Sequence, residues 1–197
     1  VIVDRDGVIN FDSDAYIKSV AEWVAIPGSL EALARLSRAH YRVVVATNQS
    51  GIARGLYTME TLNRIHQKMT NSLREHGGRI DAIFFCPHGP DDQCACRKPQ
   101  PGLLYEISER LNAPLAGVPL VGDSLRDLQS AAAVGALPVL VRSGKGLRAV
   151  QALNEAQASG TLGEVPVYDD LAAFTDDLLS GAVNPAIQAC HEANKAG

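Results

Sequence analysis

The sequence predicts an α/β fold in which a parallel sheet is covered by helices on both faces. Short aliphatic runs of strand length alternate with segments whose apolar residues recur at helical spacing. Several of these runs are apolar throughout, which is typical of strands buried on both faces of a parallel sheet. Each run ends in a polar loop, and such loops meet at one edge of an open sheet. We therefore expect a Rossmann-like doubly wound parallel sheet with one irregular loop insert and no large cap domain.

The expected elements follow one another in a regular order. Strands are predicted over residues 1–3, 41–46, 80–85, 118–121, 137–141 and 165–168. Two helices are predicted after the caps Ser29 and Thr58, one after residues 122–124, and others over residues 102–112, 147–158 and 169–179. Residues 8–25 are polar and lack a clear period, so we expect a loop or short flap over the end of the first strand. Residues 86–101 form the irregular insert.

The composition is that of an ordinary globular protein. The chain has 197 residues, of which 46% are hydrophobic and 20% charged, with a formal net charge of −4. This charge argues against a broad nucleic-acid or membrane surface, and no apolar run approaches the roughly 20 residues that span a bilayer. Val1 already lies in the first expected strand, so we expect a few residues to precede it, and we find no signal-peptide pattern. We expect one domain over residues 1–180, a tail over residues 181–197, and a cytoplasmic location.

Two carboxylates directly follow the first strand. Asp4 and Asp6 lie only two residues apart, so their charges must be offset by a cation or must share a proton. An isolated pair of this kind also fits a solvated turn. Other polar side chains follow later strands, however: Thr47 with Asn48, Lys98 with Arg97, and Asp123 with Asp127. Because these strand ends converge, the sequence favours a magnesium and phosphate site.

The converging groups suit phosphoryl transfer, which needs mainly positioning and charge compensation. A carboxylate whose charge is masked by magnesium can attack phosphorus and form an aspartyl-phosphate. A second carboxylate can protonate the leaving oxygen and then activate water. A threonine hydroxyl, loop amides and a lysine can hold the phosphoryl oxygens.

These motifs resemble those of the haloacid-dehalogenase-type phosphatases over about residues 1–141. The matching segments are Asp-Arg-Asp-Gly-Val at residues 4–8, Thr47-Asn48, Lys98-Pro99, and Gly122-Asp123 with Asp127. The resemblance implies that Asp4 is the nucleophile, Asp6 the acid/base, and Thr47 and Lys98 the remaining catalytic residues. It also implies magnesium ligands from Asp4, Asp123 and the main-chain carbonyl of Asp6. Val8 stands where the family commonly has Thr or Ser, and we expect this change to be tolerated.

The irregular insert predicts a second metal site. Four potential ligands fall within eleven residues: Cys86, His88, Cys94 and Cys96. Three thiolates and one imidazole suit a tetrahedral structural zinc, which would order a loop that has little apolar content. The alternatives are a disulfide with a spare cysteine, or simply buried thiols. The zinc loop, residues 86–98, ends in Arg97 and Lys98, so we expect zinc to fix the backbone that directs both cations toward the phosphate.

The zinc loop looks like that of two phosphatase groups, the D-glycero-D-manno-heptose-1,7-bisphosphate 7-phosphatases and the histidinol-phosphate phosphatases. Residues 47–55 and 98–102 are closer to the heptose type. The resemblance implies removal of the 7-phosphate of a small phosphosugar for lipopolysaccharide biosynthesis, and it weakly favours a monomer. It implies substrate contacts from Asp12, Tyr16, Thr47, Asn48, Gln49, Ser50, Arg54, Arg97 and Lys98.

One position departs from the heptose pattern. Ser124 stands where a lysine is usual, so we expect Lys145 or Arg142 to supply the missing cation. Arg54 and Lys145 fit an ordinary solvated surface about equally well.

Other conspicuous residues receive structural interpretations. We expect Arg5 to balance charge or to face solvent, His66 to be a packing or surface residue, Trp23 to pack the flap against the core, and Cys190 to be a free thiol. The alternatives to a heptose phosphatase are a histidinol-phosphate phosphatase, an inactive scaffold and a zinc-knuckle nucleic-acid-binding module. The acidic net charge and the lack of aromatic residues among the basic ones argue against the last.

Overall fold

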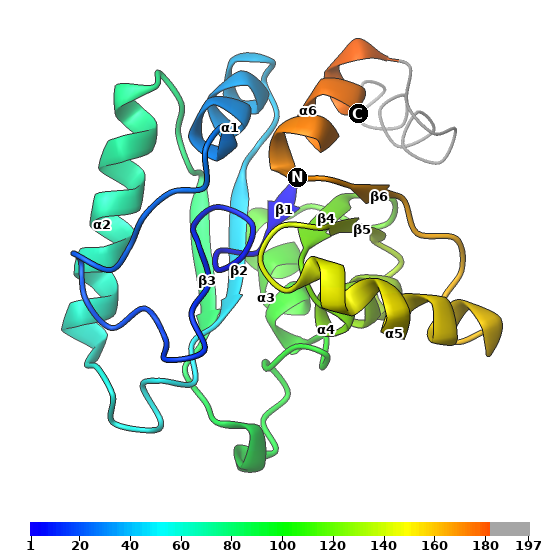
Figure 1. The fold of residues 1–197 in the computed structure, drawn as a ribbon, viewed down its shortest axis with the longest axis horizontal. Helices are drawn as coiled ribbons and strands as arrows, with labels where there is room; N and C mark the ends of the chain where they lie inside the picture. The colour runs from blue at the N-terminus through cyan, green and yellow to red at the C-terminus, as the bar shows by residue number, and fades with distance from the viewer. Residues whose placement is uncertain (182–197) are drawn as a thin grey trace.

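A six-stranded parallel sheet lies at the centre of the fold (Figure 1). The computed structural model describes residues 1–181. The strands are β1 (Ile2–Val3), β2 (Val44–Asn48), β3 (Ala82–Cys86), β4 (Pro119–Gly122), β5 (Leu137–Val141) and β6 (Val167–Tyr168). Their order is β3-β2-β1-β4-β5-β6, so the chain winds outward in both directions from β1. This arrangement confirms the predicted doubly wound sheet and places a topological switch point between β1 and β4.

Helices cover both faces of the sheet (Figure 1). They are α1 (Ser29–Arg38), α2 (Met59–Glu75), α3 (Gly102–Leu111), α4 (Leu125–Ala133), α5 (Gly146–Ala158) and α6 (Leu171–Ser180), with a short 3-10 helix, η1 (Pro90–Asp92), in the insert. One apolar cluster packs α1, α2 and α6 together, and two others pack α3, α4 and α5. The strands are therefore enclosed between two helical layers, as their apolar sequences require.

Local capping explains where two helices begin. The Thr58 hydroxyl accepts a hydrogen bond from the main-chain N–H of Thr61 at 3.2 Å, which confirms it as the cap of α2. The prediction that Ser29 caps α1 is wrong, because Gly28 takes the N-cap position with φ of 83°. The Ser29 hydroxyl instead donates to the carbonyl of Ile9 at 2.7 Å. This bond ties the start of α1 to the loop that follows β1.

The segment over residues 8–25 is fixed by buried contacts. The indole N–H of Trp23 donates to Asn10 Oδ1 at 3.0 Å, and the ring is 2% exposed, which confirms its packing role. Lys68 of α2 donates to the carbonyls of Val20 and Trp23 at 2.8 and 2.7 Å. Because Asn10 also donates to Asp6 at 2.9 Å, the flap reaches the site at the end of β1.

Within residues 1–181, no helix has both the length and the apolar character needed to cross a membrane. The expected tail beyond Gly181, which includes Cys190, lies outside the described residues.

Candidate active site

The carboxyl ends of β1, β2 and β4 open onto one cavity of about 310 Å³. The main-chain N–H of Asp4 donates to the carbonyl of Val121 at 2.9 Å, which joins the start of the site to β4. The cavity lining includes every residue predicted to act in catalysis, magnesium binding or substrate contact: Asp4, Asp6, Asp12, Tyr16, Thr47, Asn48, Gln49, Ser50, Arg54, Arg97, Lys98 and Asp123. The convergence inferred from strand ends is therefore present in the fold.

Lys98 lies buried between two carboxylates. Its Nζ is 3.2 Å from Asp4 Oδ1 and 2.5 Å from Asp127 Oδ1, and it donates to the carbonyl of Ala46 at 2.7 Å. Burial alone would lower the pKa of this lysine, but Asp127 and Asp4 outweigh that effect and raise it. The ammonium group therefore stays charged where a phosphoryl group would contact Asp4.

Asp123 is packed against two glycines. A Cβ added to Gly7 or Gly144 would lie 1.9 or 2.2 Å from Asp123 Oδ2, so no side chain fits at either position. Both glycines also have positive φ angles, 82° and 58°. The main-chain N–H of Lys145 donates to the same Oδ2 at 2.8 Å. The backbone thus holds the Asp123 carboxylate in one position.

The carboxylates of Asp4, Asp123 and Asp127 could hold a metal ion, because each offers an oxygen within 4.8 Å of the others. Burial, together with the neighbouring carboxylates, raises the pKa of Asp4 to about 6 and that of Asp123 to about 8. Lys98 lowers the pKa of Asp4 but does not cancel these effects. A hard divalent cation such as magnesium fits this oxygen donor set, since it would relieve the excess negative charge.

Asp6 faces a different set of partners. Both of its carboxylate oxygens accept bonds from Arg5 Nη2 at 2.8 Å, and further bonds come from Asn10 and Gln49 at 2.9 Å. Burial acts to raise the pKa of Asp6, but Arg5 and these hydrogen bonds lower it overall. Arg5 is 1% exposed, so its predicted role in balancing charge is confirmed and the solvent-facing alternative is wrong.

Behind Arg5 lies His66, for which the sequence predicts a packing or surface role. His66 is buried, and its Nε2 is 3.3 Å from Arg5 Nη1. Because a guanidinium can only donate, this nitrogen must accept and the imidazole must be neutral. Burial and then Arg5 lower the pKa of His66 to about 3. The packing interpretation is confirmed, but the contact spans 61 positions of sequence and left no local signal.

The loop after β2 connects the site to the zinc loop. The Asn48 side chain exchanges two hydrogen bonds of 3.1 Å with the main chain of Lys98. Gln49 Nε2 donates to Thr47 Oγ1 at 2.9 Å, and Gln49 Oε1 accepts from the Tyr57 hydroxyl at 2.6 Å. Tyr57 also lines the cavity, although the sequence did not predict a role for it. Asn48 therefore positions the backbone of Lys98, and Tyr57 orients the amide that reaches Thr47.

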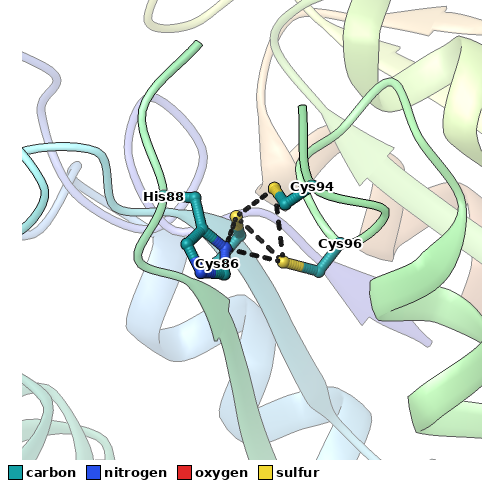
Figure 2. Close-up of side chains that lie close together, drawn as sticks. All are labelled: Cys86, His88, Cys94 and Cys96. Carbon is teal, nitrogen blue, oxygen red and sulfur yellow. Dashed lines mark hydrogen bonds between the residues drawn. The ribbon is translucent and has the colours of Figure 1, made fainter. Parts of the chain in front are cut away.

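Four potential metal ligands converge in the zinc loop (Figure 2). The close contacts join Cys86, His88, Cys94 and Cys96, with sulfur–sulfur distances of 3.1 to 3.6 Å and with His88 Nδ1 at 3.3 Å from Cys96. Thiolates at 2.3 Å from a tetrahedral zinc would lie about 3.8 Å apart, close to this spacing. The three cysteines are free, so the disulfide alternative is wrong for this structure. The donor set fits zinc.

The zinc loop leads directly to the cations of the site. Arg97 Nη1 donates to the carbonyl of His88 at 3.3 Å, and Lys98 is the next residue. The backbone that carries Lys98 is thus fixed by the zinc loop on one side and by Asn48 on the other.

The expected substitutes for a lysine at Ser124 lie in different places. Lys145 lines the cavity, where its Nζ is 2.7 Å from Asp12 and 3.3 Å from Asp14. Arg142 pairs with Asp169 at 2.7 Å and is not among the lining residues. The expectation that Arg142 replaces the missing lysine in the site is therefore wrong.

Two further arginines line the cavity. The Arg54 guanidinium lies 5.9 Å from the centre of the Tyr16 ring, which places both predicted contact residues together at the site. Arg126 also lines the cavity but was not singled out from the sequence. Its only sequence signal is its place in the helix that starts after Asp123.

Sequence models of two families match the chain. A HAD-hydrolase-like family matches residues 95–172, and the Polynucleotide kinase 3 phosphatase family matches residues 4–125. The two matches together run from Asp4 to the start of α6.

Curated relatives match nearly the whole chain. The D-glycero-beta-D-manno-heptose-1,7-bisphosphate 7-phosphatase of Bordetella bronchiseptica is 56% identical over 92% of this chain and 98% of its own length. The protein of the same name from Pseudomonas aeruginosa is 51% identical over 91% of this chain and 97% of its own.

Solved structures agree with these relatives. The D,D-heptose 1,7-bisphosphate phosphatase of B. bronchiseptica, complexed with magnesium and phosphate, has a TM-score of 0.84 at 56% identity and covers 91% of this chain and 97% of its own. The corresponding enzyme of Burkholderia thailandensis has a TM-score of 0.68 at 49% identity, over 91% of this chain and 97% of its own. With the fold, the cavity and these matches together, the chain is a HAD-type phosphatase and belongs to the family of the D-glycero-beta-D-manno-heptose-1,7-bisphosphate 7-phosphatases.

Proposed function

We propose that this chain removes the 7-phosphate of D-glycero-beta-D-manno-heptose 1,7-bisphosphate through an aspartyl-phosphate on Asp4. The observation that carries the proposal is the cavity in which Asp4 lies beside Lys98, with Asp6 and Asp123 in the same lining. The curated relatives carry the name of this activity. A small open cavity also suits a sugar phosphate.

The carboxylates of Asp4 and Asp123 and the main-chain carbonyl of Asp6 would hold magnesium. When bound, the ion neutralises charge on the phosphate and on the attacking carboxylate. Asp127 would act through Lys98, to which it lies close. Lys98 and Thr47 would balance and orient the phosphoryl oxygens.

In the first step, an Asp4 oxygen attacks phosphorus, the bond to the sugar 7-oxygen breaks, and Asp6 gives that oxygen a proton. Because Arg5 favours ionised Asp6, Asp6 would take this proton from solvent when the substrate binds. The phosphate dianion beside Asp6 acts in that direction by raising its pKa. In the second step, ionised Asp6 removes a proton from water, which attacks the phosphoryl group and restores Asp4.

The second metal is proposed to be structural. Zinc held by Cys86, His88, Cys94 and Cys96 would order residues 86–98 and so keep Arg97 and Lys98 at the cavity. We also propose that residues 1–180 act as a single domain in the cytoplasm and that the product serves lipopolysaccharide biosynthesis, as the resemblance to the heptose type implies.

The test is magnesium-dependent phosphate release from three substrates: heptose 1,7-bisphosphate, histidinol phosphate, and an oligonucleotide with a 3′-phosphate. We expect strong preference for the heptose bisphosphate. Asp4→Asn should abolish turnover and leave the fold intact, whereas Asp176→Asn, a change outside the cavity, should not. Preference for either other substrate would overturn the substrate assignment, and full activity of Asp4→Asn would overturn the mechanism.

A further inference from the structure

One arginine in the cavity lining is left without a partner. The Arg126 side chain is exposed and, within residues 1–181, forms no hydrogen bond or ion pair. The other lining cations are engaged: Lys98 with Asp4 and Asp127, Lys145 with Asp12 and Asp14, Arg97 with a carbonyl, and Arg54 over Tyr16. Arg126 can therefore bind an anion without breaking an existing contact.

Arg126 also stands where two cavities meet. A second cavity of about 640 Å³ lies along the zinc loop, and both cavities are lined by Pro90, Arg97, Lys98 and Arg126. A substrate whose reacting phosphate sits at Asp4 has its remaining atoms directed away from the buried strand ends. This shared boundary offers those atoms space and positive charge.

The place of Arg126 in α4 favours an anion in the same region. It is the second residue of the helix, so it lies in the first turn, where the helix dipole attracts negative charge. An arginine side chain adds two parallel donors that match a phosphate group.

We infer that Arg126 binds the second, non-reacting phosphate of a sugar bisphosphate and so sets the preference for bisphosphates over monophosphates. This inference rests on the proposed function. Lys98 and the divalent cation that Asp4 and Asp123 would hold compensate the reacting phosphate. The second phosphate carries up to two negative charges of its own and requires a separate cation.

The test compares kcat/KM for heptose 1,7-bisphosphate with that for heptose 7-phosphate, in the wild type and in Arg126→Gln. A hydrogen bond between charged groups contributes about 1.5–3 kcal/mol, so the ratio should fall about 10- to 100-fold, mainly through KM for the bisphosphate. Arg126→Lys should restore part of the ratio, because it keeps the charge and loses the paired donors. Arg148→Gln is the matched control, since Arg148 is also exposed, lies in the first turn of α5, and lines neither cavity.

A second measurement separates this inference from the proposed reaction. Mannose 1-phosphate, titrated calorimetrically into the magnesium-loaded protein, presents a sugar 1-phosphate and no 7-phosphate. Weaker binding to Arg126→Gln than to the wild type supports the phosphate site, even if heptose 1,7-bisphosphate is not hydrolysed and the proposed function fails. An unchanged substrate ratio together with equal binding to both proteins would overturn the inference and leave Arg126 as an ordinary surface residue.

Discussion

The buried contact between His66 and Arg5 makes stability depend on pH in a direction that can be worked out. In the folded chain the pKa of His66 is lowered to about 3, from an ordinary value of 6.5. Below pH 6.5 the unfolded chain therefore takes up a proton that the folded chain excludes. Stability supported by neutral His66 is fully present above pH 6.5 and is lost as the pH falls toward 3.

The size of the effect follows from the same two pKa values. Between about pH 7 and about pH 5, a histidine that titrates only in the unfolded state costs about 2 kcal/mol of unfolding free energy. His66 is 6% exposed, so solvent does little to screen this cost. A protonated imidazole would also place a second cation 3.3 Å from the Arg5 guanidinium.

The perturbation is His66→Gln, measured by urea unfolding of the wild type and the variant at both pH values. Glutamine can still accept the hydrogen bond from Arg5 but does not titrate. Comparing the two proteins cancels the titrations of Asp4 and Asp123, whose raised pKa values act in the opposite direction. We expect acidification to destabilise the wild type by about 2 kcal/mol more than the variant.

His76→Gln is the matched control, because His76 is an exposed histidine at the end of the same helix. Its response to pH should follow that of the wild type. If the wild type and His66→Gln lose the same stability within about 0.5 kcal/mol, His66 is not held neutral by burial and the reasoning is refuted.

Two further changes test the packing of the metal sites. Gly144→Ala should lower magnesium affinity and kcat/KM at least tenfold, because its Cβ would fall 2.2 Å from Asp123 Oδ2. The control is Gly160→Ala, which also has a positive φ, 72°, but no atom within 4 Å of the added Cβ. It should only cost about 1 kcal/mol of stability. Equal magnesium affinity in both variants would contradict this. Cys96→Ser should abolish zinc binding, measured by native mass spectrometry, because the loop that carries Lys98 loses a metal ligand. Phosphate release should fall as well. A zinc-free variant with wild-type kinetics would show that zinc does not position the lysine.

The sequence was sufficient to predict the fold because its main signals are local. Apolar runs mark the buried strands, and the period of apolar residues marks the helices. The predicted starts of two strands were less accurate: β2 begins at Val44 rather than at residue 41, and β3 begins at Ala82 rather than at residue 80. These two residues are paired with each other in the sheet. A strand's start depends on the register of its neighbour, which local sequence does not contain.

The residues of the candidate site likewise divide into those that local sequence predicts and those that depend on packing. Its motif residues could be placed because each follows a strand, and parallel strand ends meet at one edge. The contacts of Arg5 with His66 and of Tyr57 with Gln49 could not, because they arise from the packing of α2 and the loop before it against the sheet. Arg126 was missed for another reason: its significance lies in having no partner inside a shared cavity wall, and sequence alone does not show this.

The charges of the site explain why these unpredicted residues matter. Four carboxylates, those of Asp4, Asp6, Asp123 and Asp127, face two buried cations, Arg5 and Lys98. Arg5 is committed to Asp6 and Lys98 to Asp4 and Asp127, so the uncompensated charge falls where the pKa values of Asp4 and Asp123 are raised. A divalent cation at that place balances these buried charges, so the charge of a second phosphate must be met by the cations nearer the mouth of the cavity. Among them, the Arg126 side chain is the one with no hydrogen bond, ion pair or ring contact within residues 1–181, which is why we assign it to that phosphate.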